Sequence, residues 1–357
     1  MGLIERIKQI FKRDKTKLLP EPQYTQETNQ HDNSWIISNG SGNYQPQLSK
    51  IDLDITNFLT KYSQSVAQIN SSDQINNYKT AYACLCYSGE QITQEQYNYN
   101  GSIENNLLAN LKSNNMYTST EEQGFYHIQS QNYQMPNFED MTRVYINCDS
   151  TNIADLAQTI INSNTNPNFY MKFVSNDSNA QVPRNEKMVI YCNKNELDYT
   201  MNLLNYCKQI RPELFTGSQA LPFLKNEQGI ASIGYQPTTN QYIDLQGQTK
   251  QIPQSVNAFI TNMLQESYMN AAREIARVDS NLSFLFDENN YNNETLYMQN
   301  YPYILENYQE YLLSSMKAKL EVLSRYNNIE IDGITPQNQY SMDNDRQASQ
   351  ENYYDNR

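Results

Sequence analysis

The segments RVYINC (143–148), FYMKF (169–173) and KMVIYC (187–192) decide the fold, because each alternates apolar and polar side chains as a half-buried strand does. One face of these strands is predicted to be buried and carries Val144, Ile146, Cys148, Phe169, Met171, Phe173, Met188, Ile190 and Cys192. The opposite face carries Arg143, Tyr145, Asn147, Tyr170, Lys172, Lys187 and Tyr191. If the strands pair in one sheet, this second face is a surface of cations and phenols, and it is where the sequence indicates chemistry.

Helical patterns surround this stretch on both sides along the chain. Apolar residues three and four apart predict helices over 51–66, 76–87, 103–111, 153–161, 197–210, from Pro253 onward and over Tyr303–Tyr326. A short strand is predicted from Gly124 to Ile128, and residues 211–250, rich in Pro and Gly, are interpreted as a long loop. The fold class is therefore α+β, a small mixed or antiparallel sheet with flanking helices between helical N- and C-terminal sections.

The chain divides into four predicted sections. Residues 1–13 form a basic amphipathic helix, 14–46 a polar disordered linker, 47–326 a single α+β domain and 327–357 a disordered polar tail. In the helix, apolar residues at 3, 7 and 10 leave the rest of the surface to Arg and Lys. This pattern is typical of a helix that binds a membrane surface or a partner protein, although it also suits a helix that docks on its own domain.

Charge is distributed unevenly along the chain. The formal net charge is −13, yet the first twenty residues carry six cations against two carboxylates. That local +4 leaves −13 minus 4, or −17, on the remainder. This acidic remainder of the chain excludes general nucleic-acid binding, which requires clustered Lys and Arg. It is compatible with a small anion site.

The cysteines and histidines indicate neither a metal site nor a cofactor. The five cysteines are Cys84, Cys86, Cys148, Cys192 and Cys207, an odd number without zinc-site spacing, and there are two histidines. Reduced core thiols fit a cytoplasmic compartment. No apolar run reaches the ~20 residues that span a bilayer.

Several ordered motifs resemble the HopA-class type III effector family, whose distant relatives include components of class V lanthipeptide clusters. The similar pieces are YACLCYSG (82–89), Asn115 followed by Gly124-Phe125, RVYIN (143–147), YMK (170–172), RNEKMVIY (184–191), Phe215-Thr216 and SIG (232–234). The resemblance covers roughly residues 50–275. Two features depart from the family pattern: Pro237 stands where the family has an Arg, and the stretch between Phe215 and Ser232 is poor in the glycines that the family has.

The family is in turn similar to phosphothreonine lyases, which remove phosphate by β-elimination. This resemblance implies that Lys172 is the base and that Arg143 and Arg184 hold the phosphate. Tyr145 takes the place of the acid, and Tyr191 donates a hydrogen bond. Tyr170 and Asn147 complete the binding face.

Two functions from different classes are therefore open. One is a phosphoserine or phosphothreonine lyase-like site acting on a phosphorylated peptide or protein, without a cofactor. The other is a non-catalytic, effector-like or peptide-binding module that uses the same face and is tethered by residues 3–13. Both are compatible with a cytoplasmic protein, a peripheral membrane protein or a secreted effector.

Overall fold

The computed structural model describes residues 48–68, 77–88, 92–113, 116–137, 140–181, 183–215 and 221–334. The expected N-terminal helix at 3–13, the linker at 14–46 and the tail beyond 334 lie outside these residues. The same holds for Gly89, Asn115 and Thr216 of the family-like motifs.

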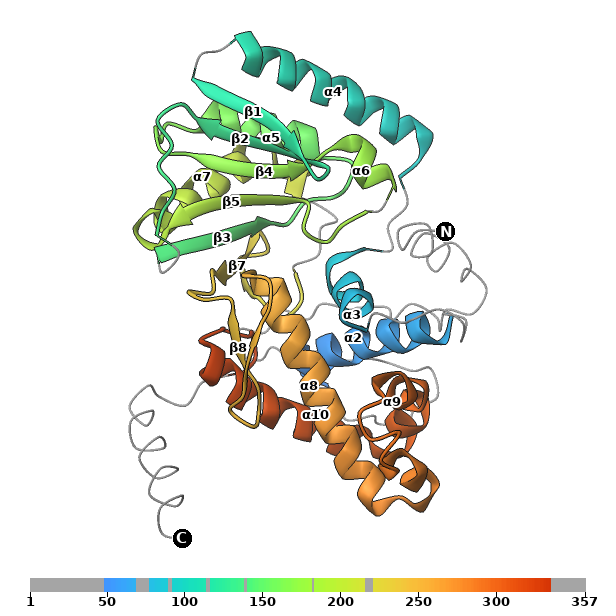
Figure 1. Ribbon diagram of the computed structural model, residues 1–357. Coiled ribbons are helices and arrows are strands. Elements are labelled where there is room, and N and C mark those ends of the chain that lie inside the picture. The colour runs from blue at the N-terminus through green and yellow to red at the C-terminus, as the bar shows by residue number, and fades with distance from the viewer. Residues whose placement is uncertain are drawn as a thin grey trace, which may run out of the picture.

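A seven-stranded antiparallel sheet forms one half of the molecule, in the order β1-β2-β4-β5-β3-β7-β6 (Figure 1). Its strands are β1 (Tyr117–Glu122), β2 (Phe125–Ser130), β3 (Met141–Ile146), β4 (Tyr170–Val174), β5 (Met188–Asn193), β6 (Lys225–Glu227) and β7 (Ala231–Tyr235). Gln123 and Gly124 form the two-residue turn between β1 and β2, and both have positive φ, which favours glycine. Together with the helices, this sheet confirms the predicted α+β class.

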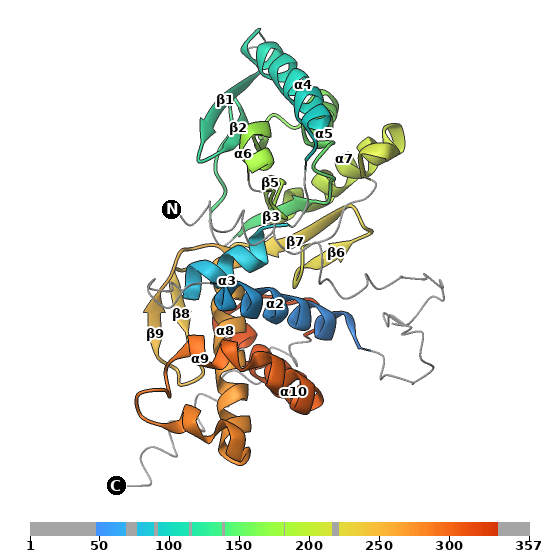
Figure 2. The ribbon, with the colours of Figure 1, turned by 90° about the vertical axis from the view of Figure 1, so that its right-hand side faces the viewer.

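The apolar face of the sheet packs against helices that lie before and between its strands in sequence. These are α4 (Gln94–Ser113), α5 (Ile153–Ser163), α6 (Asn176–Gln181) and α7 (Leu197–Ile210), with 3-10 turns at Lys194–Glu196 and Pro212–Phe215. Val144, Met171 and Ile190 are at most 1% exposed in this core. Figure 2 shows α4, α5 and α7 on the same side of the sheet. The alternation read from the sequence thus defines the buried face correctly.

A second half is built around α8 (Val256–Val278), which packs against α10 (Tyr301–Asn327) and α3 (Asn77–Cys86). The remaining elements are α2 (Lys50–Ala67), α9 (Glu294–Gln299), a 3-10 helix at Ser280–Phe286 and the hairpin β8 (Gln241–Ile243) with β9 (Thr249–Gln251). Ser49 begins α2 with a capping box to Asp52, and Ser255 caps α8 by accepting from the Ala258 N–H. Tyr145 and Val189 of the sheet belong to the apolar core of this half, so the two halves share a boundary on the polar face of the sheet.

Three sequence-based expectations differ from the structure. The interpretation of 211–250 as a loop is wrong, because this stretch contains β6, β7, β8 and β9, and β7 pairs with β3 inside the sheet. β1 was missed because its sequence YTSTEE is polar, as suits an exposed edge. Residues 328–334, expected to belong to the polar tail, are part of the described structure, and Ile329, Ile331 and Ile334 are buried against the helical core.

Candidate functional site

The strand register brings most of the predicted site residues into two neighbouring rows on one face. Tyr170 lies opposite Tyr191, which lies opposite Arg143 on β3. In the next row His127 pairs with Lys172, and Val189 lies between Lys172 and Tyr145. We call the side chains of Arg143, Tyr145, Tyr170, Lys172, Arg184 and Tyr191 the cation–tyrosine face.

Stacked rings fill the first row. The Tyr170 and Tyr191 rings are 4.8 Å apart and nearly parallel, at 18°, and the Tyr133 ring lies 5.1 Å from that of Tyr170. The Arg143 guanidinium lies 5.4 Å from the centroid of the Tyr191 ring, within cation–π distance. His127 Nδ1 is 2.6 Å from the Tyr170 hydroxyl, which fixes the far end of the stack. The row is therefore an ordered aromatic platform that ends in a cation.

Lys172 forms an ion pair in the second row. Its Nζ is 2.6 Å from Glu186 Oε1, and the two side chains are only 14% and 10% exposed. The Asn257 side chain, from the first turn of α8, donates to Glu186 Oε2 at 3.0 Å. Burial by itself lowers the pKa of Lys172, but the charge and hydrogen bond of Glu186 outweigh it, so the pKa is raised. Lys172 is therefore a cation at neutral pH in this arrangement.

Arg143 and Tyr145 present polar atoms without a partner. In the described part of the chain, Arg143 Nε and the Tyr145 hydroxyl are enclosed and form no hydrogen bond of ordinary geometry, although the two side chains lie close enough for each to shift the pKa of the other. No described carboxylate lies within ion-pair distance of Arg143, whose side chain as a whole is half-buried. Burial raises the pKa of Tyr145 well above its usual value, while the neighbouring Arg143 charge opposes the shift. The tyrosine is 1% exposed, which disfavours a role as proton donor to a bound substrate.

Arg184 is placed by a short bridge between two parts of the chain. Residues Tyr87 and Arg184 form an isolated antiparallel bridge, supported by the Ser88 N–H donating to the Pro183 carbonyl at 2.9 Å. The guanidinium lies 4.7 Å from the centroid of the Phe125 ring and 5.4 Å from that of Tyr87. Lys172 Nζ lies 4.3 Å from the same Phe125 ring. Phe125 thus holds Arg184 and Lys172 near one another.

Asn147, predicted as a binding residue, is 4% exposed and bonded within the sheet. Its side chain donates to Asn226 Oδ1 at 3.2 Å and accepts from Ser232 Oγ at 3.4 Å. Gly234 lies opposite Arg143, at a point where a Cβ would be 3.3 Å from both Tyr145 and Val256. In the SIG motif, Ser232 therefore holds Asn147, and Gly234 gives room for α8 to approach the sheet.

His127, Asn257 and Tyr133 lie outside the predicted set of site residues. The hairpin β1–β2 places His127 directly opposite Lys172 on the polar face. Burial and the Lys172 charge lower the pKa of His127. The sequence did contain a signal for this position. His127 follows Phe125 by two residues, so both side chains lie on one face of the strand that ends at Ser130. Asn257 lies in a helix far along the chain, and no local pattern links it to Glu186.

The comparisons with known proteins give weak likenesses. No family model and no curated protein matches this chain. Among solved structures, the effector protein from Pseudomonas syringae pv. tomato strain DC3000 is similar with a TM-score of 0.39 and 10% identity, over 61% of this chain and 88% of that one. The effector protein from Pseudomonas syringae pv. syringae strain 61 has a TM-score of 0.38 and 12% identity, over 60% and 88%. Likenesses at this level carry no inference about activity.

In the described residues, no three His, Cys, Asp or Glu side chains are grouped so that they could hold a metal ion. None of the helices in the described ranges is both long and apolar enough to cross a membrane. All five cysteines are buried, and none of them forms a disulfide.

Proposed function

We propose that the chain is a HopA-like protein whose cation–tyrosine face binds a phosphorylated serine or threonine side chain of a peptide or protein. The observation that carries this proposal is the state of Arg143. Its Nε is enclosed without a hydrogen-bond partner, and no described carboxylate lies within ion-pair distance of the guanidinium, although the charge of Glu186 acts on it from farther away. A phosphate oxygen would supply both the missing acceptor and a direct ion-pair partner.

Arg184 and the tyrosine stack support the same ligand class. Arg184 is half-buried against Phe125 and Tyr87, and its charge has no ion-pair partner in the described ranges. Two guanidinium groups on one face suit the two charges that a phosphomonoester carries near neutral pH. The Tyr170–Tyr191 stack offers a flat apolar surface for the adjoining peptide.

Binding without turnover fits the charge state of Lys172. A lysine that removes an α-proton must be neutral, and the Glu186 carboxylate holds Lys172 in its protonated form. The enclosed Tyr145 hydroxyl is likewise a poor acid. We therefore favour a non-catalytic, effector-like or peptide-binding module, tethered to a membrane or partner by residues 3–13.

The pairing of His127 with Lys172 favours a second candidate function, phospho-Ser/Thr lyase activity. Lys172 would take the α-proton, the Cβ–O bond would break, and the electron pair of the Cα–H bond would form the Cα=Cβ double bond. His127, half-buried on the same face, would protonate the departing phosphate in place of Tyr145. This role requires a protonated imidazole, although burial and the Lys172 charge lower the pKa of His127. This chemistry is the one that the resemblance to phosphothreonine lyases implies, and it requires Glu186 to release Lys172.

Binding is tested by calorimetry with phosphoserine and phosphothreonine peptides and their unphosphorylated forms. Only the phosphorylated peptides are expected to bind. Arg143→Gln should weaken binding about 10- to 100-fold, because one charge-assisted hydrogen bond contributes about 1.5–3 kcal/mol. Arg211→Gln is the matched control, since Arg211 lies on the end of α7 beside Glu213 and outside the face. Equal affinity for both peptide forms would refute the proposal.

Turnover is tested by mass spectrometry of the same phosphopeptides after incubation. Loss of the elements of phosphoric acid, abolished by Lys172→Ala, would establish the lyase. Peptides that bind and remain intact would establish the binding module.

A further inference from the structure

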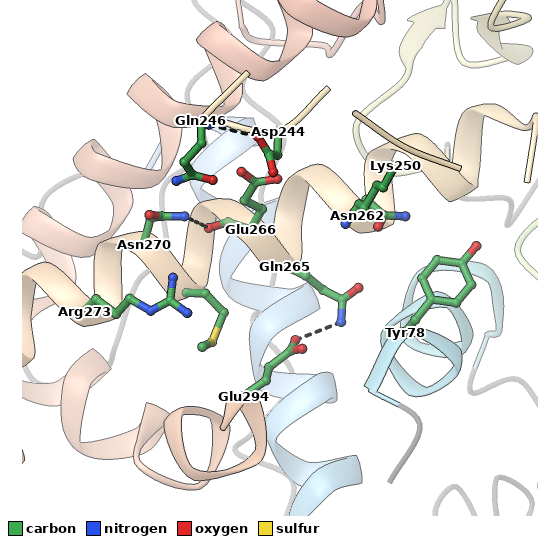
Figure 3. Close-up of a pocket in the computed structure, with 11 residues that line it drawn as sticks. Tyr78, Asp244, Gln246, Lys250, Asn262, Gln265, Glu266, Asn270, Arg273 and Glu294 are labelled. Carbon is green, nitrogen blue, oxygen red and sulfur yellow. Dashed lines mark hydrogen bonds between the residues drawn. The ribbon is translucent and has the colours of Figure 1, made fainter. Parts of the chain in front are cut away.

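The polar atoms of two cavities in the described structure are satisfied to different degrees. The larger cavity, of about 350 Å³, lies along α8, and the protein itself supplies partners for its carboxylates. Glu294 accepts from the Gln265 amide at 2.8 Å (Figure 3), and Glu266 accepts from the Tyr242 hydroxyl at 2.8 Å. Because these carboxylates already have partners, this cavity does not indicate a ligand.

The smaller cavity, of about 10 Å³, lies between α4, α5 and α6 in the sheet half. A volume of this size holds about one water-sized sphere, so the cavity admits a single water molecule or one small ion. Its polar lining consists of Asn100 and Glu104 of α4, Ser150, and Asn176 and Asn179 of α6. The cavity shares no residue with the cation–tyrosine face.

Two buried asparagine side chains in this lining have amide atoms without a partner. Asn179 is 1% exposed, and in the described part of the chain neither its Oδ1 nor its Nδ2 forms a hydrogen bond. Asn176 is 7% exposed, and its Nδ2 donates to the Tyr97 carbonyl at 2.9 Å, which leaves Oδ1 as the end without a partner. Because buried polar atoms of native proteins are normally satisfied, these amides indicate a ligand in the cavity.

Glu104 brings a negative charge to the same cavity. Its side chain is buried and accepts from the Asn176 N–H at 2.8 Å. The charged neighbours that act on it are Asp177 and Glu121, which are carboxylates as well. Burial raises the pKa of Glu104 to about 7, and these two neighbours add to the shift. At about pH 8 the cavity therefore contains a buried carboxylate that its neighbours repel.

From this arrangement we infer that the cavity binds one monovalent metal cation, sodium or potassium. Carboxylate and amide oxygens are the ligands that hard cations prefer, and Glu104, Asn176 and Asn179 supply them. The Asn179 amide can turn its oxygen toward the ion, because no described hydrogen bond holds either of its ends. One positive charge balances the single carboxylate of the lining. A water molecule would satisfy the amides but would leave the charge of Glu104 uncompensated.

The test is thermal denaturation of the full chain at about pH 8 in sodium, potassium or tetramethylammonium chloride at equal ionic strength. Tetramethylammonium is larger than a water molecule and cannot enter the cavity, so it reproduces the screening by salt without binding. With sodium or potassium the Tm should rise to a plateau, by about 2–5 °C at about ten times Kd, because the ion binds only the folded chain.

Three variants locate the ion. Glu104→Gln keeps an oxygen for the Asn176 N–H but removes the charge, so the rise in Tm should disappear. Asn179→Leu replaces the two unpartnered amide atoms by methyl groups of similar shape, and the rise should disappear here too. Glu121→Gln is the matched control, because it removes the same charge from an exposed residue of β1 outside the cavity, and it should keep the rise. In tetramethylammonium chloride Glu104→Gln should be more stable than the parent, because no small cation then compensates the carboxylate.

Two results would overturn the inference. Equal Tm values of the parent in the three salts would leave a water molecule as the occupant of the cavity. A rise that Glu104→Gln or Asn179→Leu retains, or that Glu121→Gln loses, would show that the ion binds elsewhere on the acidic surface. If Asn179→Leu does not fold, the comparison of Glu104→Gln with Glu121→Gln decides alone.

Discussion

At the scale of single residues, Glu186 controls the charge of the polar face. It pairs with Lys172, and Asn257 holds its second oxygen, so the carboxylate is satisfied on both sides. Because the Glu186 carboxylate compensates the positive charge of Lys172, Arg143 and Arg184 remain the cations to which a ligand can bind. The same pair determines whether Lys172 can act as a base.

Glu186→Gln should lower the pKa of Lys172, because burial and the Arg143 charge then act without a compensating carboxylate. It should also lower the free energy of unfolding by about 3 kcal/mol, as expected when one partner of an enclosed ion pair is removed. NMR titration of the lysine side chain and urea denaturation measure the two effects. Replacing both partners, Lys172→Met with Glu186→Leu, should restore part of the stability. An unchanged Lys172 pKa in Glu186→Gln would contradict this account, and faster elimination in that variant would support the lyase.

Glu104 gives a pH-dependent contribution to stability. Burial raises its pKa from 4.5 to about 7, although the Asn176 N–H donates to it at 2.8 Å. A raised pKa favours the protonated folded state, so this contribution is present below the usual pKa and is lost as the pH rises through 7. The loss amounts to at most about 3 kcal/mol.

Glu104→Gln, which remains neutral and keeps an oxygen for the Asn176 N–H, should therefore be more stable than the parent at about pH 8 and similar to it at about pH 4.5. Urea denaturation of both proteins across this range isolates the contribution of Glu104, because the other carboxylates are common to both. Parallel pH dependences would show that Glu104 does not titrate as described.

At the scale of elements, local pattern predicted the three central strands and the direction of their side chains. β3, β4 and β5 agree with the predicted segments to within two residues, since alternation is a local property. The same pattern did not reveal what covers the polar face. The start of α8 buries Tyr145 and reaches Glu186 through Asn257, and α8 lies far from the strands in sequence. Strand β7 was not predicted, because the prolines and glycines around it indicated a loop.

Gly234→Ala tests the approach of α8 to the sheet. The added Cβ would lie 3.3 Å from Tyr145 Cε2 and from Val256 Cγ1, so we expect a loss of about 1–3 kcal/mol in the free energy of unfolding. Val256→Ala in the same chain removes one of these contacts. Urea denaturation of the two single variants and the double variant should show a double-variant loss smaller than the sum of the single losses. If the two losses of free energy were strictly additive, the added Cβ would not be in steric conflict with Val256.

At the scale of the whole molecule, two cores meet at the cation–tyrosine face. The sheet core contains Val144 and Ile190, while Tyr145 and Val189 on the same strands belong to the helical core. Each strand therefore joins both cores through its alternating side chains. This explains why the polar face carries buried groups, and why its charges need specific partners such as Glu186.

The charge asymmetry of the chain leads to the proposal that residues 3–13 bind anionic membranes. Six cations against two carboxylates in the first twenty residues contrast with −17 on the remainder. Each Lys or Arg near an anionic surface contributes about 1 kcal/mol, and the apolar residues of the helix can enter the headgroup region. The acidic remainder is repelled, so binding should depend on this segment alone.

Sedimentation with anionic vesicles should therefore retain the full chain and lose a chain that lacks residues 1–20. Binding should fall in neutral vesicles and at high salt, because the electrostatic part is screened beyond about 10 Å at 0.1 M salt. Replacing Arg6 and Lys8 by Glu reverses charge while keeping Leu3, Ile7 and Ile10, and should release the protein from anionic vesicles. If the full and shortened chains sediment equally, the segment does not act as a membrane anchor, and a partner protein or the helical half of this chain becomes its expected contact.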